Sequence, residues 1–149
     1  MAKFQFRLQT LLRLREADRQ RRRGELAQAY RAEEILRQQR DFLAAEETEM
    51  RKRMQVASGP GPVQVDQLLD THRYAIMLQA RAKALEEQQA RLLREIERRR
   101  QVLVEADREV RVLEKLRDRL LAQYRAEEAK QELKQLDEVA QRCGGPADP

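Results

Sequence analysis

The sequence lacks most of what a globular domain uses to build its core. It has no Trp, only three Phe and three Tyr, and aromatic residues make up 4% of its 149 positions. So few large apolar side chains cannot fill a thick three-dimensional core. The apolar runs are short, which excludes a transmembrane helix and the hydrophobic segment of a secretory signal.

Cysteine and histidine are almost absent as well. Cys143 is the single Cys, so neither an intrachain disulfide nor a cysteine metal cluster can form. His72 is the single His, which leaves no convincing Ser-His-Asp triad or His-based metal site. The glycines of the sequence GPGP are not followed by Lys and Ser or Thr, so no phosphate-binding loop is present. We therefore expect no enzyme activity, no cofactor, no metal and no small-molecule substrate.

Charge is what the sequence has in abundance. Charged residues make up 38% of the chain, and 31 basic against 26 acidic side chains give a net charge of +5. A composition rich in Ala, Leu, Glu, Arg and Gln is typical of long helices and coiled coils. Disorder is the competing interpretation of so charged a chain. The periodic Leu and Ile positions favour helices.

One interruption divides the chain, the sequence ASGPGPV at residues 57–63. Its Gly ends a helix, and Pro60 and Pro62 cannot continue one. Asp66 is a candidate N-cap for the next helix, and Pro62 is a candidate first helical residue. We predict a single all-α domain over 1–142, a long antiparallel two-helix coiled-coil hairpin. Its helices cover about 4–56 and about 65–142, its loop covers 57–64, and residues 143–149 form a disordered tail.

The second predicted helix carries a clear heptad pattern. From Leu85, alternating steps of four and three residues reach mostly apolar positions, as in a coiled-coil seam. The positions are Leu85, Gln89, Leu92, Ile96, Arg99, Leu103, Ala106, Val110, Leu113, Arg117, Leu120 and Tyr124.

The first predicted helix has a poorer pattern, and its weakest part is residues 13–30. Six of the residues between Arg13 and Arg23 are Arg, and Ala17 is the only apolar side chain between Leu14 and Leu26. Folding the chain about residue 60 pairs residues whose numbers add up to about 118 to 120. This pairing places Phe42 level with Tyr74, Ile76 and Leu78, and leaves the second helix without a partner from Arg117 to Arg142. It also creates a basic collar of Arg19, Arg21, Arg22, Arg23, Arg98, Arg99 and Arg100.

The basic collar has two interpretations. It is an ordinary solvated face, or it is a patch kept for an acidic partner, because like charges at close range destabilise a helix pair. RNA is one acidic partner to consider, but no aromatic side chains are interleaved with the arginines, which argues against nucleic acid.

The stretch FQFRLQTLLRLREADRQRRRGELAQAYRAEE at residues 4–34 resembles the flagellar export protein FliJ family. The resemblance lies in Phe4 and Phe6, the block LQTLLRLRE, and the charged helix that leads to Leu26 and Ala29. It extends over nearly the whole chain, with two helices, a Gly-containing break and a charged C-terminal part.

The resemblance implies a cytoplasmic, non-enzymatic component of the flagellar type III export apparatus, associated peripherally with the inner membrane at the flagellar base. The expected fold is an antiparallel coiled coil similar to the central stalk of rotary ATPases. The expected partners are the hexameric export ATPase, the cytoplasmic domain of the export gate membrane protein, and export chaperones.

The resemblance also implies two binding regions. The terminal end, which would face the ATPase, has Phe4, Leu8, Leu11, Leu12, Arg13, Arg15, Arg117, Leu120 and Tyr124. The gate-binding region beside the loop has Phe42, Tyr74 and Leu78, which core packing of the hairpin explains equally well. Gln39 and Glu46 are polar where the family pattern has apolar groups, which puts the extent of this region in doubt.

Three alternatives remain open at this point. The chain could be the equivalent stalk of a virulence type III secretion injectisome, although the Phe-containing start favours the flagellar system. It could be an RNA-binding helical hairpin, or a self-associating scaffold. An unpaired apolar overhang that includes Leu120, Leu133 and Leu136 makes weak self-association plausible even for a stalk.

Overall fold

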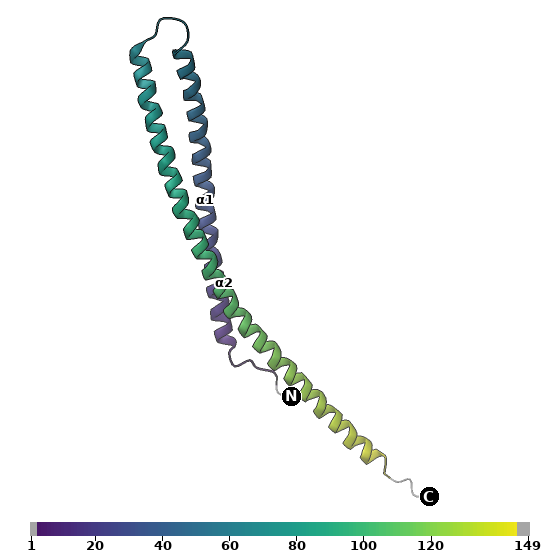
Figure 1. Cartoon of the computed structure of the whole chain (residues 1–149). Helices are drawn as coiled ribbons and strands as arrows, with labels where there is room; N and C mark the ends of the chain where they lie inside the picture. Colours follow the sequence, from purple (N-terminus) through teal and green to yellow (C-terminus); the bar gives the residue numbers. More distant parts are fainter. Residues whose placement is uncertain (1–2, 146–149) are drawn as a thin grey trace. The chain divides into compact units, whose positions relative to one another are not determined.

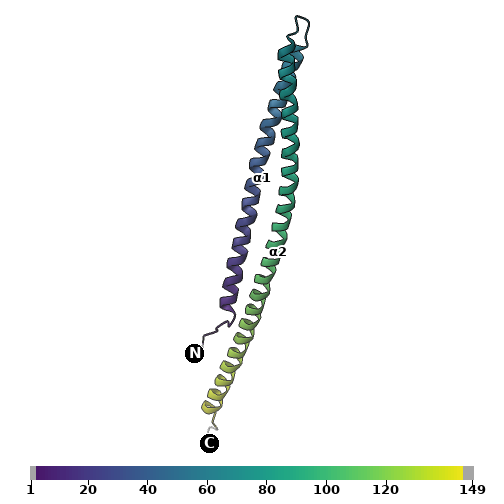
Figure 2. The same cartoon turned by 90° about the vertical axis from the view of Figure 1, so that its left-hand side faces the viewer.

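The structure, a computed structural model, describes residues 3–145 and consists of two helices joined by a short loop. Helix α1 spans Gln9–Ala57 and helix α2 spans Val65–Cys143. Figures 1 and 2 show α1 running beside α2 in the opposite direction. The described residues contain no strand, so the predicted all-α helical hairpin is confirmed.

The loop between the helices is built from the residues that the sequence pattern marked as helix breakers. The Met54 carbonyl near the end of α1 accepts from both the Ser58 amide at 3.0 Å and the Ser58 hydroxyl at 2.8 Å. Gly61 has a φ of 151°, a backbone conformation that residues other than Gly rarely adopt. The Gln64 carbonyl accepts the first helical hydrogen bond of α2, from Leu68 at 3.1 Å. The N-cap is therefore Gln64. Asp66 lies in the first helical turn instead, where its charge complements the helix dipole.

The first helix starts later than the sequence suggested. Residues 3–8 are not helical, and α1 begins at Gln9 where about residue 4 was expected. None of these residues is a good N-cap, and the Gln9 amide donates to the Phe6 carbonyl at 3.1 Å, which forms a turn just before the helix. Phe4 of this non-helical segment contacts Tyr124 of α2.

The end of α2 lies near the position that was expected. The helix ends at Cys143, and the Gly144 amide donates to the Ala140 carbonyl at 2.8 Å. Of the tail expected at 143–149, Cys143 is helical, and residues 146–149 lie outside the described residues.

Burial along α2 follows the predicted heptad positions. Among the twelve positions from Leu85 to Tyr124, only Leu120 is exposed, at 38%. The matching face of α1 was harder to see because charged residues alternate with apolar ones along it. In the loop-side half of α1, steps of four and three residues reach only buried or half-buried positions, which are Arg22, Leu26, Ala29, Glu33, Leu36, Arg40, Leu43, Glu47, Met50 and Met54.

The chain forms two compact units. The terminal unit consists of Met1–Gln20 and Val104–Pro149, and the loop-side unit is Arg21–Leu103. In the terminal unit, Leu12 and Val110 are fully buried. In the loop-side unit, Leu43, Met50 and Leu78 form the core cluster, with Ala75, Ala82 and Leu85 packed against it.

The register of the hairpin differs from the predicted one. Residues in contact across the hairpin have numbers that add up to between 124, for Arg15 with Glu109, and 130, for Tyr30 with Arg100. The expected value of 118 to 120 was wrong by about seven residues. A shift of one heptad keeps the same residues in the seam, so the apolar pattern is satisfied equally well in both registers.

This register changes two predicted neighbourhoods. Phe42 lies with Arg81 and Leu85 and not level with Tyr74. The partnered part of α2 continues past Arg117 to Tyr124, which contacts Phe4, so the overhang is shorter than expected. All residues from 129 to 145 are exposed.

Candidate functional site

In the terminal unit, the non-helical segment 3–8 before α1 packs against α2. The rings of Phe4 and Tyr124 have centroids 5.7 Å apart and planes inclined at 49°. Tilted aromatic pairs of this kind are attractive beyond the area that they bury. A groove of about 450 Å³ lies beside the pair, and we call it the terminal groove. Its apolar lining is Phe4, Phe6, Leu8, Leu116, Leu120 and Tyr124.

The structure separates the nine residues predicted for the terminal end. Four of them, Phe4, Leu8, Leu120 and Tyr124, line the terminal groove. Leu12 is fully buried and belongs to the core, whereas Leu11 is 38% exposed outside the groove. The other three residues of the set are arginines, namely Arg13, Arg15 and Arg117, and Arg13 is exposed. Sequence reasoning missed Leu116, which lies outside the heptad steps.

The arginines at the start of α1 engage acidic residues of α2 within the terminal unit. Arg15 forms an ion pair with Glu109 at 2.8 Å, and Arg19 pairs with Asp107 at 3.2 Å. Arg111 approaches the second carboxylate oxygen of Asp107 at 2.9 Å. The first helix thus compensates for its missing apolar stripe with charge-assisted contacts to the second.

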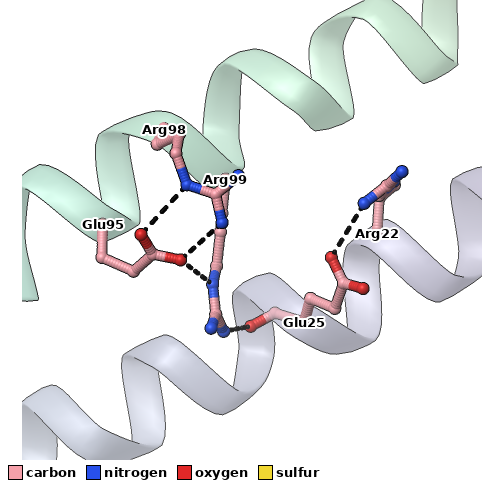
Figure 3. A network of polar contacts seen from close by, with 5 residues as sticks. All are labelled: Arg22, Glu25, Glu95, Arg98 and Arg99. Carbon is pink, nitrogen blue, oxygen red and sulfur yellow. Dashed lines mark hydrogen bonds and ion pairs between the residues drawn. The ribbon is translucent and has the colours of Figure 1, made fainter.

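A network of five charged residues crosses the seam in the loop-side unit (Figure 3). Glu95 accepts from Arg98 Nη2 at 2.7 Å and from Arg99 Nε at 2.8 Å. The other end of the Arg99 guanidinium donates to the main-chain carbonyl of Glu25, and the Glu25 carboxylate pairs with Arg22 at 3.3 Å. Arg99 therefore links the two helices through hydrogen bonds, at a position where a coiled coil usually has an apolar residue.

The two arginines of α2 control the protonation of Glu95. Hydrogen bonds from Arg98 and then Arg99 stabilise the carboxylate and lower the pKa of Glu95 to about 2. Between pH 4.5 and about 2, where a Glu with the ordinary pKa of 4.5 would be mostly protonated, Glu95 therefore stays ionised.

The seven arginines of the basic collar are divided between the two units. Arg19 belongs to the terminal unit and the other six arginines belong to the loop-side unit. Arg19, Arg22 and Arg99 are half-buried beside carboxylates. Arg100 is exposed, donates to the Tyr30 hydroxyl at 2.8 Å, and lies 5.7 Å from the centre of that ring. Arg21 and Arg23 are exposed.

The three residues of the predicted gate-binding region have different environments. Leu78 is 1% exposed in the core cluster, so core packing explains it. Phe42 is 67% exposed and lies at a groove of about 480 Å³ with Ile35, Arg81 and Leu85, which we call the loop-side groove. Tyr74 is 37% exposed and does not line it. The cross-helix part of this groove, Arg81 and Leu85, was missed because the expected register was wrong.

The chemistry available at these sites is that of protein contacts. Within residues 3–145, no group of three or more His, Cys, Asp or Glu could hold a metal ion. His72 is exposed. The terminal groove offers aromatic and aliphatic side chains, and the loop-side groove combines such side chains with Arg81 and Glu46. Apolar surface with a polar rim is typical of protein-binding sites.

Neither described helix has a stretch that is long and apolar enough to cross a membrane. No curated protein and no solved structure matches the chain. The model of one protein family, described as the flagellar FliJ protein, matches residues 4–145. The resemblance noted in residues 4–34 is thereby confirmed over nearly the whole chain.

Proposed function

The chain belongs to the flagellar FliJ protein family, a non-enzymatic component of flagellar protein export, and we propose that it acts there as a stalk for the export ATPase. In this proposal its terminal unit binds the hexameric ATPase and promotes the assembly and activity of the ring. Its loop-side unit binds the cytoplasmic domain of the export gate. We further propose that it escorts export chaperones and works in the cytoplasm, at the inner membrane of the flagellar base.

The observation that best supports ATPase binding is the terminal groove. It gathers four residues of the predicted terminal end, Phe4, Leu8, Leu120 and Tyr124, from two parts of the chain more than a hundred residues apart. Apart from the groove, the terminal unit is held together mainly by ion pairs and a narrow core. A unit that is held together by ion pairs and offers only a small apolar groove at this contact suits a stalk, because extensive apolar contacts would hold it in a single position within a ring.

The direct test is ATP hydrolysis by the flagellar export ATPase of the same organism, titrated with this protein. We expect stimulation that saturates well below one copy per ATPase subunit, because one stalk would serve a ring. A soluble, helical sample without effect at any ratio would contradict the stalk proposal.

Variants of the terminal groove make this test specific. Phe4→Ala with Leu120→Ala removes apolar surface from the groove, and we expect the half-saturating concentration to rise about tenfold. The matched control is Leu14→Ala with Val112→Ala, two residues of the same unit that are 63% and 65% exposed outside the groove. An equal effect of both pairs would show that the groove is not the contact.

Gate binding is tested by Phe42→Ala with Tyr74→Ala. Both side chains are exposed, so their loss should weaken capture of the gate domain while leaving ATPase stimulation and helicity unchanged. Leu78→Ala serves as the folding control, because it removes a core side chain and should lower the melting temperature. Equal loss of gate binding and of ATPase stimulation, with lower helicity, would show that Phe42 and Tyr74 only support the fold.

A further inference from the structure

The last part of α2 packs against none of the residues that the structure describes, 3–145. Every residue from 129 to 145 is exposed, although α2 remains helical to Cys143. Helices of this length that bury nothing are marginal in water, because packing of an apolar face supplies most of a helix's stability. This segment lies within the terminal unit, beyond the contact between Phe4 and Tyr124.

This segment carries an apolar stripe of its own. Steps of three and four residues connect Ala126, Ala129, Leu133, Leu136, Ala140 and Cys143. The stripe positions lie two residues beyond those that would continue the seam of α2 against α1, which at about 100° per residue places the stripe nearly half a turn away from that seam. It does not continue that seam, so its occupant must approach from another side. Leu133 and Leu136 are 61% and 64% exposed at its centre.

We propose that this stripe pairs with the same stripe of a second copy of the chain, in antiparallel orientation. Leu133 would face Leu136 of the second copy, Ala129 would face Ala140, and Ala126 would face Cys143. The small Ala layers would let the two helices approach closely on both sides of the central Leu layers. The contact is self-complementary, as a two-fold symmetric interface requires.

The charges that flank the stripe select this arrangement. Lys130 and Asp137 occupy equivalent flanking positions one heptad apart, about 10 Å along the same helix, too far to pair with each other. In the proposed register, Lys130 of each copy lies beside Asp137 of the other, so two opposite-charge contacts form. Flanking charges of this kind set the orientation and register of coiled coils.

The competing arrangements bring like charges together. Sliding the antiparallel pair by one heptad places Lys130 beside Lys130, or Asp137 beside Asp137. A parallel pair places Glu132 beside Asp137 and Arg125 beside Lys130. Only the proposed register satisfies the apolar stripe and the flanking charges together.

Cysteine cross-linking tests the geometry. In an antiparallel pair the two Cys143 residues lie at opposite ends, so the unmodified protein should give little covalent dimer under mild oxidation. Ala126→Cys places a thiol opposite Cys143 of the second copy and should give a disulfide-linked dimer. Ready cross-linking of the unmodified protein would indicate a parallel pair and overturn the proposal.

Charge reversal tests the register in sedimentation experiments over a range of protein concentrations. Lys130→Glu should weaken the dimer about tenfold, and adding Asp137→Lys should restore it. Lys134→Glu is the matched control, since it makes the same charge change on the outer face of the segment. A monomer at all concentrations would overturn the proposal. The proposal would also be overturned if the K130E/D137K double variant dimerised as weakly as Lys130→Glu alone. None of these outcomes bears on the ATPase proposal, which is tested by hydrolysis.

Discussion

Leu12 and Leu14 lie two residues apart on α1, but only Leu12 packs in the core. Leu12 is fully buried and Leu14 is 63% exposed. We expect Leu12→Ala to lower the free energy of unfolding by about 2–3 kcal/mol, because it removes buried methyl groups and leaves a cavity. Leu14→Ala should change it by less than about 0.5 kcal/mol. Urea denaturation followed by circular dichroism measures both, and equal effects would contradict the assigned helix face.

Glu95 makes the stability of the hairpin depend on pH in the acidic range. Its pKa is about 2 in the folded chain, below the ordinary value of 4.5, because Arg98 and Arg99 stabilise the charged form. Its stabilising contribution is therefore complete above pH 4.5 and is lost as the pH falls toward 2. We expect Glu95→Gln to melt at a lower temperature than the parent at neutral pH, and the difference to shrink over this range.

The control for Glu95 is Glu97→Gln. Glu97 is more exposed and approaches Arg100 at only 3.8 Å, so its removal should change the melting temperature little at any pH. If both variants showed the same dependence on acid, the general loss of negative charge would explain the result and the network in Figure 3 would not.

At the scale of the helices, Gly24 is a position where α1 can be improved. Its backbone is helical, and a Cβ atom built there would meet no atom within 4 Å. Ala has a higher helix propensity than Gly by about 1 kcal/mol. We therefore expect Gly24→Ala to raise the melting temperature without changing ATPase stimulation. A lower melting temperature would indicate that α1 needs flexibility at this position.

The helices themselves were readable from the sequence, whereas their register was not. The heptad steps from Leu85 predicted the buried face of α2 because that periodicity is local. The register depends on which of several equivalent layers meet, and a shift of one heptad changes no inward position. The late start of α1 was missed for a related reason, because the partner of Phe4 is Tyr124, far along the sequence. Contacts of this kind leave no local signal.

At the scale of the whole molecule, the net charge is unevenly divided between the two units. The terminal unit has 14 basic and 13 acidic side chains, and the loop-side unit has 17 and 13. The loop-side unit thus carries +4 of the net charge of +5. The arginines at the start of α1 are balanced by carboxylates of α2, as the pairs Arg15–Glu109 and Arg19–Asp107 illustrate.

This division predicts different responses to salt. Attraction between net charges is screened as the ionic strength rises. We expect added salt to weaken binding of the gate domain to the loop-side unit more than it raises the half-saturating concentration for ATPase stimulation. Parallel titrations at low and physiological salt measure the two responses. Equal salt dependence would show that net charge does not distinguish the two partners.

The loop of residues 58–64 connects α1 to α2, and the two helices pair through side chains such as those of the Leu43, Met50 and Leu78 cluster. Its role is to keep the local concentration of one helix near the other high. Encoding α1 and α2 as two separate peptides would turn the hairpin into a bimolecular complex. Its dissociation constant would then give the pairing energy in solution directly, without denaturant, and fluorescent labels on the two peptides would follow their association in real time.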